Sequence, residues 1–148
     1  MSNSALGDIS FGIVAYLFTG RFTPPEIGLW LLGALLAAVV FVMAFTFFHA
    51  LAFWLGSSYG LAEQAMNAML TLAMYPSDIF QGAVRFMMLT VLPAAFVGAV
   101  PLDVVRGLDL NGLAVLAVAA VIITIVSSAT FYLGLRRYES GSALNVNV

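Results

Sequence analysis

The feature that most constrains this chain is a run of 36 consecutive residues, Ile27 to Ala62, without a charged side chain. A helix needs only about 20 apolar residues, each rising 1.5 Å, to cross the hydrocarbon core of a bilayer. The cluster Gly56-Ser57-Ser58-Tyr59-Gly60 predicts a turn inside the run, because glycine and serine mark chain reversals. We interpret the run as one spanning helix from Ile27 to about Leu55, a turn, and the entry to a further helix.

The composition also favours a bilayer environment. Hydrophobic residues make up 63% and charged residues 8% of the 148 residues, whereas soluble domains average about 45–50% and 25%. Without cysteine there is no disulfide framework, thiol nucleophile or cysteine metal site. The net charge of −2 gives no reason to expect a nucleic-acid partner. We expect an all-α protein with a single polytopic transmembrane domain over residues 1–148.

The other apolar segments predict about three more spans. A helix from about Ala5 to Gly20 would be a short or truncated span. Leu61 to Met74 is helical in pattern and fits either a short span or a helix lying in the interface. Leu113 to Leu135 is the clearest further span, because Asp109 and Arg136 bracket an uncharged stretch around it.

One apolar segment is interrupted. Ile79 to Leu102 is apolar except for Arg85, and Pro93 and Pro101 break its helical hydrogen bonding. An unbroken span and a re-entrant pair of short helices both fit, since irregular backbone is tolerated at membrane depth where protein covers it.

Sequence signals locate both ends of the Ile27–Leu55 helix. Thr23-Pro24-Pro25-Glu26 predicts its start, because threonine caps, proline suits the first helical position and Glu26 completes a capping box. Trp30 and Trp54 lie near its two ends, where amphipathic rings favour the membrane interface.

Small residues predict where helices contact each other. Gly33 and Ala37, four apart, permit close approach. Ala120, Thr124 and Ser128 form a stripe that we expect to meet another helix. In the segment 61–74, one face carries Leu61, Ala65, Met69 and Leu72, and another carries Glu63 and Asn67. The methionines Met66, Met69, Met74, Met87 and Met88 predict adaptable packing.

The cations give an orientation. Arg136-Arg137, directly after the last span, indicates a cytoplasmic C-terminus by the positive-inside rule. Arg21 and Arg106 lie in loops that this orientation places outside, so they count against it.

Signals for catalysis are nearly absent. His49 is the only histidine, and a metal site usually needs three or more protein ligands, so we interpret it as a packed or hydrogen-bonded residue. Glu63 fits a proton or substrate contact, but a hydrated position at the cytoplasmic interface is favoured because a charge is costly at the bilayer centre. Asp78 and Arg85, seven apart, are interpreted as structural residues at a helix break rather than as a substrate site. Phosphate-loop motifs are missing, so any nucleotide must be bound by another chain.

From Phe53 onward the chain resembles a known family. The residues that carry the resemblance are Phe53-Trp54-Leu55-Gly56, Tyr75-Pro76-Ser77-Asp78-Ile79-Phe80, Arg85, Leu92-Pro93-Ala94-Ala95-Phe96, Pro101 and Gly134-Leu135-Arg136-Arg137-Tyr138-Glu139-Ser140-Gly141. Together they resemble the C-terminal half of a type-2 ATP-binding-cassette permease, in a bacterial branch of uncharacterised permeases and viologen exporters. The opening Gly7-Asp8-Ile9-Ser10-Phe11-Gly12 is similar to the start of the family's third span.

The resemblance implies a six-span permease of the bacterial inner membrane. It would pair with a second permease subunit, identical or different, and with two cytosolic P-loop ATPase subunits. The segments 61–74 and 113–135 would be the fifth and sixth spans, and the prolines between them would shape short re-entrant helices. The functional candidates are Glu63 and the family-motif residues Tyr75, Pro76, Asp78, Arg85, Pro93, Pro101, Arg136, Arg137, Tyr138 and Glu139.

The resemblance implies that family members are longer than this chain. We expect the chain to correspond to spans three to six and to lack equivalents of the first two spans and of the coupling helix that engages the ATPase. Our leading hypothesis is a permease subunit that exports a hydrophobic or cationic small molecule, with no cofactor and with ATP hydrolysis on a partner. The alternatives are a small non-transporting membrane scaffold or accessory protein, or an inactive truncated permease.

Overall fold

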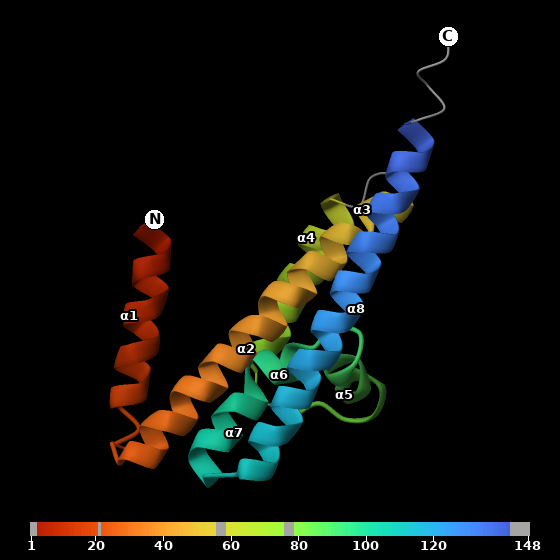
Figure 1. The fold of residues 1–148 in the computed structure, drawn as a ribbon. Helices are drawn as coiled ribbons and strands as arrows, with labels where there is room; N and C mark the ends of the chain where they lie inside the picture. The colour runs from red at the N-terminus through yellow and green to blue at the C-terminus, as the bar shows by residue number, and fades with distance from the viewer. Residues whose placement is uncertain (1–2, 21, 56–58, 76–78, 143–148) are drawn as a thin grey trace.

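The structure, a computed structural model, describes residues 3–20, 22–55, 59–75 and 79–142. Every regular element in these ranges is a helix (Figure 1). Arg21 and the predicted turn at positions 56–58 lie outside the described residues. The expected all-α fold is therefore confirmed for the part of the chain that the structure describes.

Two helices dominate the fold. The helix α2 (Pro24–Ala50) continues through Leu51 into α3 (Ala52–Leu55), and α8 runs over Leu110–Ser142. Both are long and apolar enough to cross a membrane, over Pro24–Leu55 and Leu110–Arg137. Only 28% and 17% of their most apolar windows are buried inside the protein. A core helix of a soluble protein would be mostly covered by its own chain, so these helices fit a bilayer instead.

Two shorter helices flank the long pair. The helices α1 (Asn3–Leu17) and α4 (Tyr59–Ala73) have 15 residues each, which gives a length of about 22 Å. A hydrocarbon core is about 30 Å thick. Among the described residues, two helices thus meet the length and composition of a span, and the expected four spans are not confirmed.

The start of α2 follows the sequence signal. The Glu26 carboxylate accepts hydrogen bonds from the Thr23 backbone N–H at 3.0 Å and from the Thr23 hydroxyl at 2.7 Å. Pro24 occupies the first helical position, where its missing N–H costs no hydrogen bond.

The segment between α4 and α8 consists of short helices, α5 (Gly82–Leu89), α6 (Ala94–Val97) and α7 (Ala99–Gly107). Pro93 caps α6. The Pro101 ring would clash with the carbonyl group of Val97, four residues earlier, in a continuous helix. The chain therefore breaks at Gly98 and α7 starts anew. The unbroken-span alternative is therefore wrong. The chain is broken as the other alternative expected, but into three short helices rather than a pair, and their re-entrant position in the membrane stays a prediction.

The helices α2 and α8 pack along a seam. Several small residues are buried on the two helices: Gly33, Ala37 and Ala44 on α2 and Ala120 on α8. Val40, Leu116 and Ala120 form one of the two apolar cores. Gly33 lies next to Pro101 of α7, so the predicted close approach at Gly33 and Ala37 is confirmed.

The predicted stripe on α8 is displaced by one residue. Ala120 is buried as expected, but Ser127 is fully buried whereas Ser128 is half-buried. The Ser127 hydroxyl donates a 2.6 Å hydrogen bond to the Met43 carbonyl of α2. The Thr124 hydroxyl instead donates to Ala120 within its own helix. The seam repeats at alternating steps of three and four residues, and the constant four-residue spacing missed this shift.

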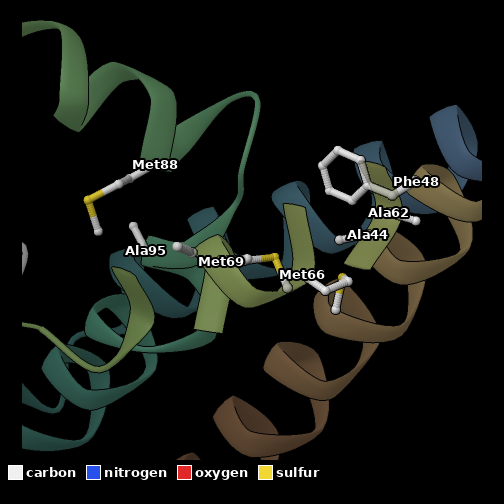
Figure 2. Close-up of a cluster of buried hydrophobic side chains, with 8 residues drawn as sticks. Ala44, Phe48, Ala62, Met66, Met69, Met88 and Ala95 are labelled. Atoms are coloured by element: carbon white, nitrogen blue, oxygen red, sulfur yellow. The ribbon is translucent and has the colours of Figure 1, made fainter. Parts of the chain in front are cut away.

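The second core joins α2, α4, α5 and α6 (Figure 2). Its buried side chains are Ala44, Phe48, Ala62, Met66, Met69, Met88, Ala94 and Ala95. Packing is confirmed for Met66, Met69 and Met88, while Met74 and Met87 are exposed. On α4 the buried residues are Ala62, Met66 and Met69, while Leu61 and Glu63 are exposed.

The arrangement of the helices defines two ends of the molecule (Figure 1). The helix α3, the start of α4 and the C-terminal part of α8 lie at one end. The helix α7 lies toward the other end, where α2 and α8 begin. The helix α1 stands apart from the bundle and approaches α2 only near that second end, where Tyr16 stacks on Trp30 at a ring-centroid distance of 4.5 Å.

Candidate functional site

A groove of about 490 Å³ lies between α2, α8 and the connection from α5 to α6. The helix α2 supplies one wall, α8 another, and the C-terminal end of α5 with Pro93 and Phe96 the third. The lining residues are Val40, Ala44, Phe47, Phe48, Leu89, Thr90, Val91, Pro93, Phe96, Val115, Val118, Ala119, Ile122, Ile123 and Val126.

The lining is almost purely apolar. Thr90 is the only lining residue with a polar side chain, and its hydroxyl already donates to the Phe86 carbonyl at 2.7 Å. Among the lining residues that the structure describes, none has an acidic, basic or nucleophilic side chain apart from the Thr90 hydroxyl. The lining can therefore hold an apolar molecule by contact, but it offers no group for covalent or acid–base chemistry.

The groove opens sideways rather than into the bundle. Val118, Ile122 and Val126 line it and are still exposed on the surface of α8. The groove is therefore open on the outer surface of α8, where an apolar molecule can reach its lining.

Two smaller cavities lie elsewhere on α2. A cavity of about 280 Å³ is bounded by α1, α2 and α7, and includes Tyr16, Trp30 and Pro101. Another of about 330 Å³ lies at the other end and includes His49, Phe53 and Phe131.

His49 is engaged within its own helix. Its ring packs on Phe45 at 4.0 Å between centroids, and its Nδ1 lies 3.0 Å from the Phe45 carbonyl oxygen. Among the described residues, no group of three or more histidine, cysteine, aspartate or glutamate side chains could hold a metal ion. The hydrogen-bonded interpretation of His49 is therefore confirmed.

The comparison with protein families identifies the family to which the chain belongs. The family model described as ABC-2 family transporter protein matches residues 1–142. The chain belongs to the ABC-2 transporter family. No curated protein and no solved structure matches it.

Membership of the ABC-2 transporter family gives the general role of this protein. Permeases of the family are membrane subunits that work with ATP-binding subunits of ABC transporters, and they are not themselves catalytic. The family and the apolar helices together identify a membrane protein. The resemblance to ABC-2 permeases inferred from the motif residues is confirmed.

The structure does not gather the predicted functional candidates of this ABC-2 chain into one site. Pro93 lines the groove and Pro101 lines the cavity beside α1. Pro76 and Asp78 lie outside the described residues, and so do the side chains of Tyr138 and Glu139 on α8. The candidates with exposed side chains are Glu63, Tyr75, Arg85, Arg136 and Arg137.

Two of these positions have local interpretations. Glu63 is exposed near the start of α4, at the same end as α3, which fits the hydrated interfacial position. The Arg137 guanidinium lies over the Trp54 ring at 5.2 Å from its centroid. This contact ties the C-terminal part of α8 to α3. Whether any candidate acts in transport stays a prediction.

The groove itself was missed by the search for chemical motifs. Its walls are valine, isoleucine, leucine and phenylalanine, and such residues in a membrane helix normally indicate only lipid contact. A usable signal was the spacing of Val118, Ile122 and Val126, four apart on α8. That spacing identifies a bulky face distinct from the small-residue seam.

Proposed function

We propose that this ABC-2 chain is a membrane-spanning permease subunit that exports a hydrophobic small molecule, energised by separate cytosolic ATPase subunits. The observation that carries the proposal is the family match over residues 1–142. The two long apolar helices support it because they provide the membrane-crossing frame that a permease requires.

In the proposed topology, α1, α2 with α3, α4 and α8 are four spans, and α5 to α7 form a re-entrant segment on the outer side. The 15-residue helices α1 and α4 would be short spans, which a bilayer accommodates by local thinning. Arg136 and Arg137 place the C-terminus in the cytoplasm by the positive-inside rule. The host membrane is the bacterial inner membrane.

The groove favours a hydrophobic over a cationic substrate. None of the described residues that line it has a carboxylate, so a cation would lose its hydration there without gaining a counter-ion from them. An apolar molecule has no such favourable hydration to lose when it enters the groove. It also reaches the lining directly from the bilayer, because α8 leaves the groove open at Val118 and Ile122.

The mechanism we propose is alternating or lateral access. ATP-driven closure of the ATPase subunits would shift the packing of the spans, and the substrate would leave between this permease and a second one, identical or different. The α2–α8 seam would move as a unit, because the Ser127–Met43 hydrogen bond and its small residues hold the two helices together.

The test is purification of the full chain from native membranes in mild detergent, followed by transport in vesicles. We expect a P-loop ATPase to co-purify, and ATP-dependent movement of a fluorescent hydrophobic compound that stops when the ATPase is mutated in its phosphate loop. A chain that purifies without any nucleotide-binding protein, in membranes that move no such compound, would contradict the proposal and favour a non-transporting scaffold.

A further inference from the structure

The protein shows two kinds of apolar surface on the same pair of helices. Where α2 and α8 touch, Val40 packs against Leu116 and Ala120, and the Ser127 hydroxyl donates a hydrogen bond to the Met43 carbonyl. Helix contacts in membranes generally use small and hydroxyl-bearing residues, because these allow close backbone approach. The seam therefore shows what this chain uses to bind a helix.

The groove wall on α8 lacks that character. Apart from Ala119, its residues are branched and bulky, such as Val118, Ile122 and Val126. They keep a neighbouring backbone at a distance and leave a furrow that a flexible alkyl chain can fill. A volume of about 490 Å³ lies within the range of ligand-binding clefts, about 300–1,000 Å³.

A cation stands one helical turn from the groove. Arg85 and Leu89 are four residues apart on α5, so their side chains share a face, and Leu89 lines the groove. The Arg85 side chain is exposed. An arginine on an apolar membrane segment extends its charged end toward the head-group layer, where basic pockets between helices bind anionic lipid head groups.

We propose that the groove binds one acyl chain of an anionic bilayer phospholipid, whose phosphate is bound by Arg85. The apolar walls hold the alkyl chain, and the guanidinium adds the charge complementarity that selects an anionic head group.

The experiment reconstitutes the full chain into vesicles containing phosphatidylglycerol with a photoreactive diazirine in one acyl chain, and maps the labelled peptides by mass spectrometry. A parallel sample uses phosphatidylcholine with the same diazirine chain. We expect the label to concentrate on Phe96 and Ile122, with about fivefold more from phosphatidylglycerol, the gain expected for one arginine near the membrane surface.

Two matched pairs of variants sharpen the test. Ile122→Trp fills the groove and should abolish groove labelling, whereas Val121→Trp changes a neighbouring residue of equal exposure (58% against 56%) outside the groove and should leave it unchanged. Arg85→Gln should remove the preference for phosphatidylglycerol, whereas Arg106→Gln, on an exposed arginine of α7, should preserve it.

Three results would overturn the proposal: even labelling of all exposed faces of α8, equal labelling by both lipids, or crosslinks joining two copies through the groove. If Ile122→Trp fails to fold, the Arg85→Gln and Arg106→Gln pair still decides the matter, because both arginines are exposed.

Discussion

The long helices and the broken segment are stabilised in different ways. The helices α2 and α8 contact each other over much of their length, through Val40, Leu116 and Ala120 and through the hydrogen bond from Ser127 to Met43. The segment α5 to α7 is made of helices of eight, four and nine residues, too short to be stable alone. It depends on a few close contacts with the rest of the chain. A single substitution should therefore damage the broken segment more than the long pair.

The largest effect is expected at Gly98, between α6 and α7. A Cβ atom there would overlap the carbonyl group of Ala73 at the end of α4. Since backbone cannot move aside as a side chain can, we expect Gly98→Ala to lower the free energy of unfolding by about 3 kcal/mol. Thermal unfolding in detergent, followed by tryptophan fluorescence, measures the change.

The matched control is Gly60→Ala in α4, where a Cβ would meet nothing within 4 Å. We expect this change to be neutral or to stabilise by up to about 1 kcal/mol, because alanine is the better helix former. Equal destabilisation by the two variants would mean that the close approach of Gly98 to the Ala73 backbone does not determine stability.

A smaller effect is expected where α8 meets α3. A Cβ on Gly134 would lie 2.7–2.9 Å from side-chain atoms of Phe53. One of these atoms is the Phe53 Cβ, which ring rotation cannot move, so the short helix α3 must shift slightly; we expect Gly134→Ala to cost about 1–2 kcal/mol, within the usual range for overpacking. The double variant Gly134→Ala with Phe53→Ala, which removes the close Cγ and Cδ2 atoms, should recover part of the loss, and a double variant worse than the sum of both would refute the steric explanation.

These contrasts show why the sequence predicted the regular part better than the broken part. Helix bounds, the Thr23–Glu26 start and the approach at Gly33 depend on local pattern, and each was correct. The position of Gly98 against Ala73 depends on how distant segments meet, which no local pattern contains. Pro93 and Pro101 predicted that the helix would break but not what would hold the pieces.

The candidate site was harder to predict for a related reason. Sequence reasoning looks for polar and charged residues, which carry chemistry, and it selected Glu63, Arg85 and the family motifs. The groove is formed by apolar residues whose only distinction is the shape they enclose. That shape depends on where α5 and α6 lie against α8, so it became visible only with the fold.

On the α2–α8 seam, the third effect concerns the buried hydroxyl group. Ser127→Ala removes the hydrogen bond to the Met43 carbonyl and should cost about 0.6–1.7 kcal/mol, the range measured for interhelical hydrogen bonds in membrane proteins. Ser128→Ala, one residue further and half-buried, is the control and should change the unfolding free energy by less than about 0.5 kcal/mol. A larger loss of unfolding free energy for Ser128→Ala than for Ser127→Ala would contradict the position of Ser127 in the α2–α8 contact and would favour the stripe Ala120, Thr124 and Ser128.

The smallest effect is expected at the C-terminal part of α8. Replacing Arg137 by glutamine removes the cation above the Trp54 ring and should cost about 0.5–1 kcal/mol, as for other exposed cation–π pairs. Arg136→Gln is the matched control, because Arg136 is the neighbouring arginine and is exposed like Arg137. The Trp54 emission spectrum should change in the Arg137 variant alone. If both variants behave alike, α3 is held to α8 by Phe53 and Gly134 without help from the arginine, and this end of the seam depends on packing as the rest of it does.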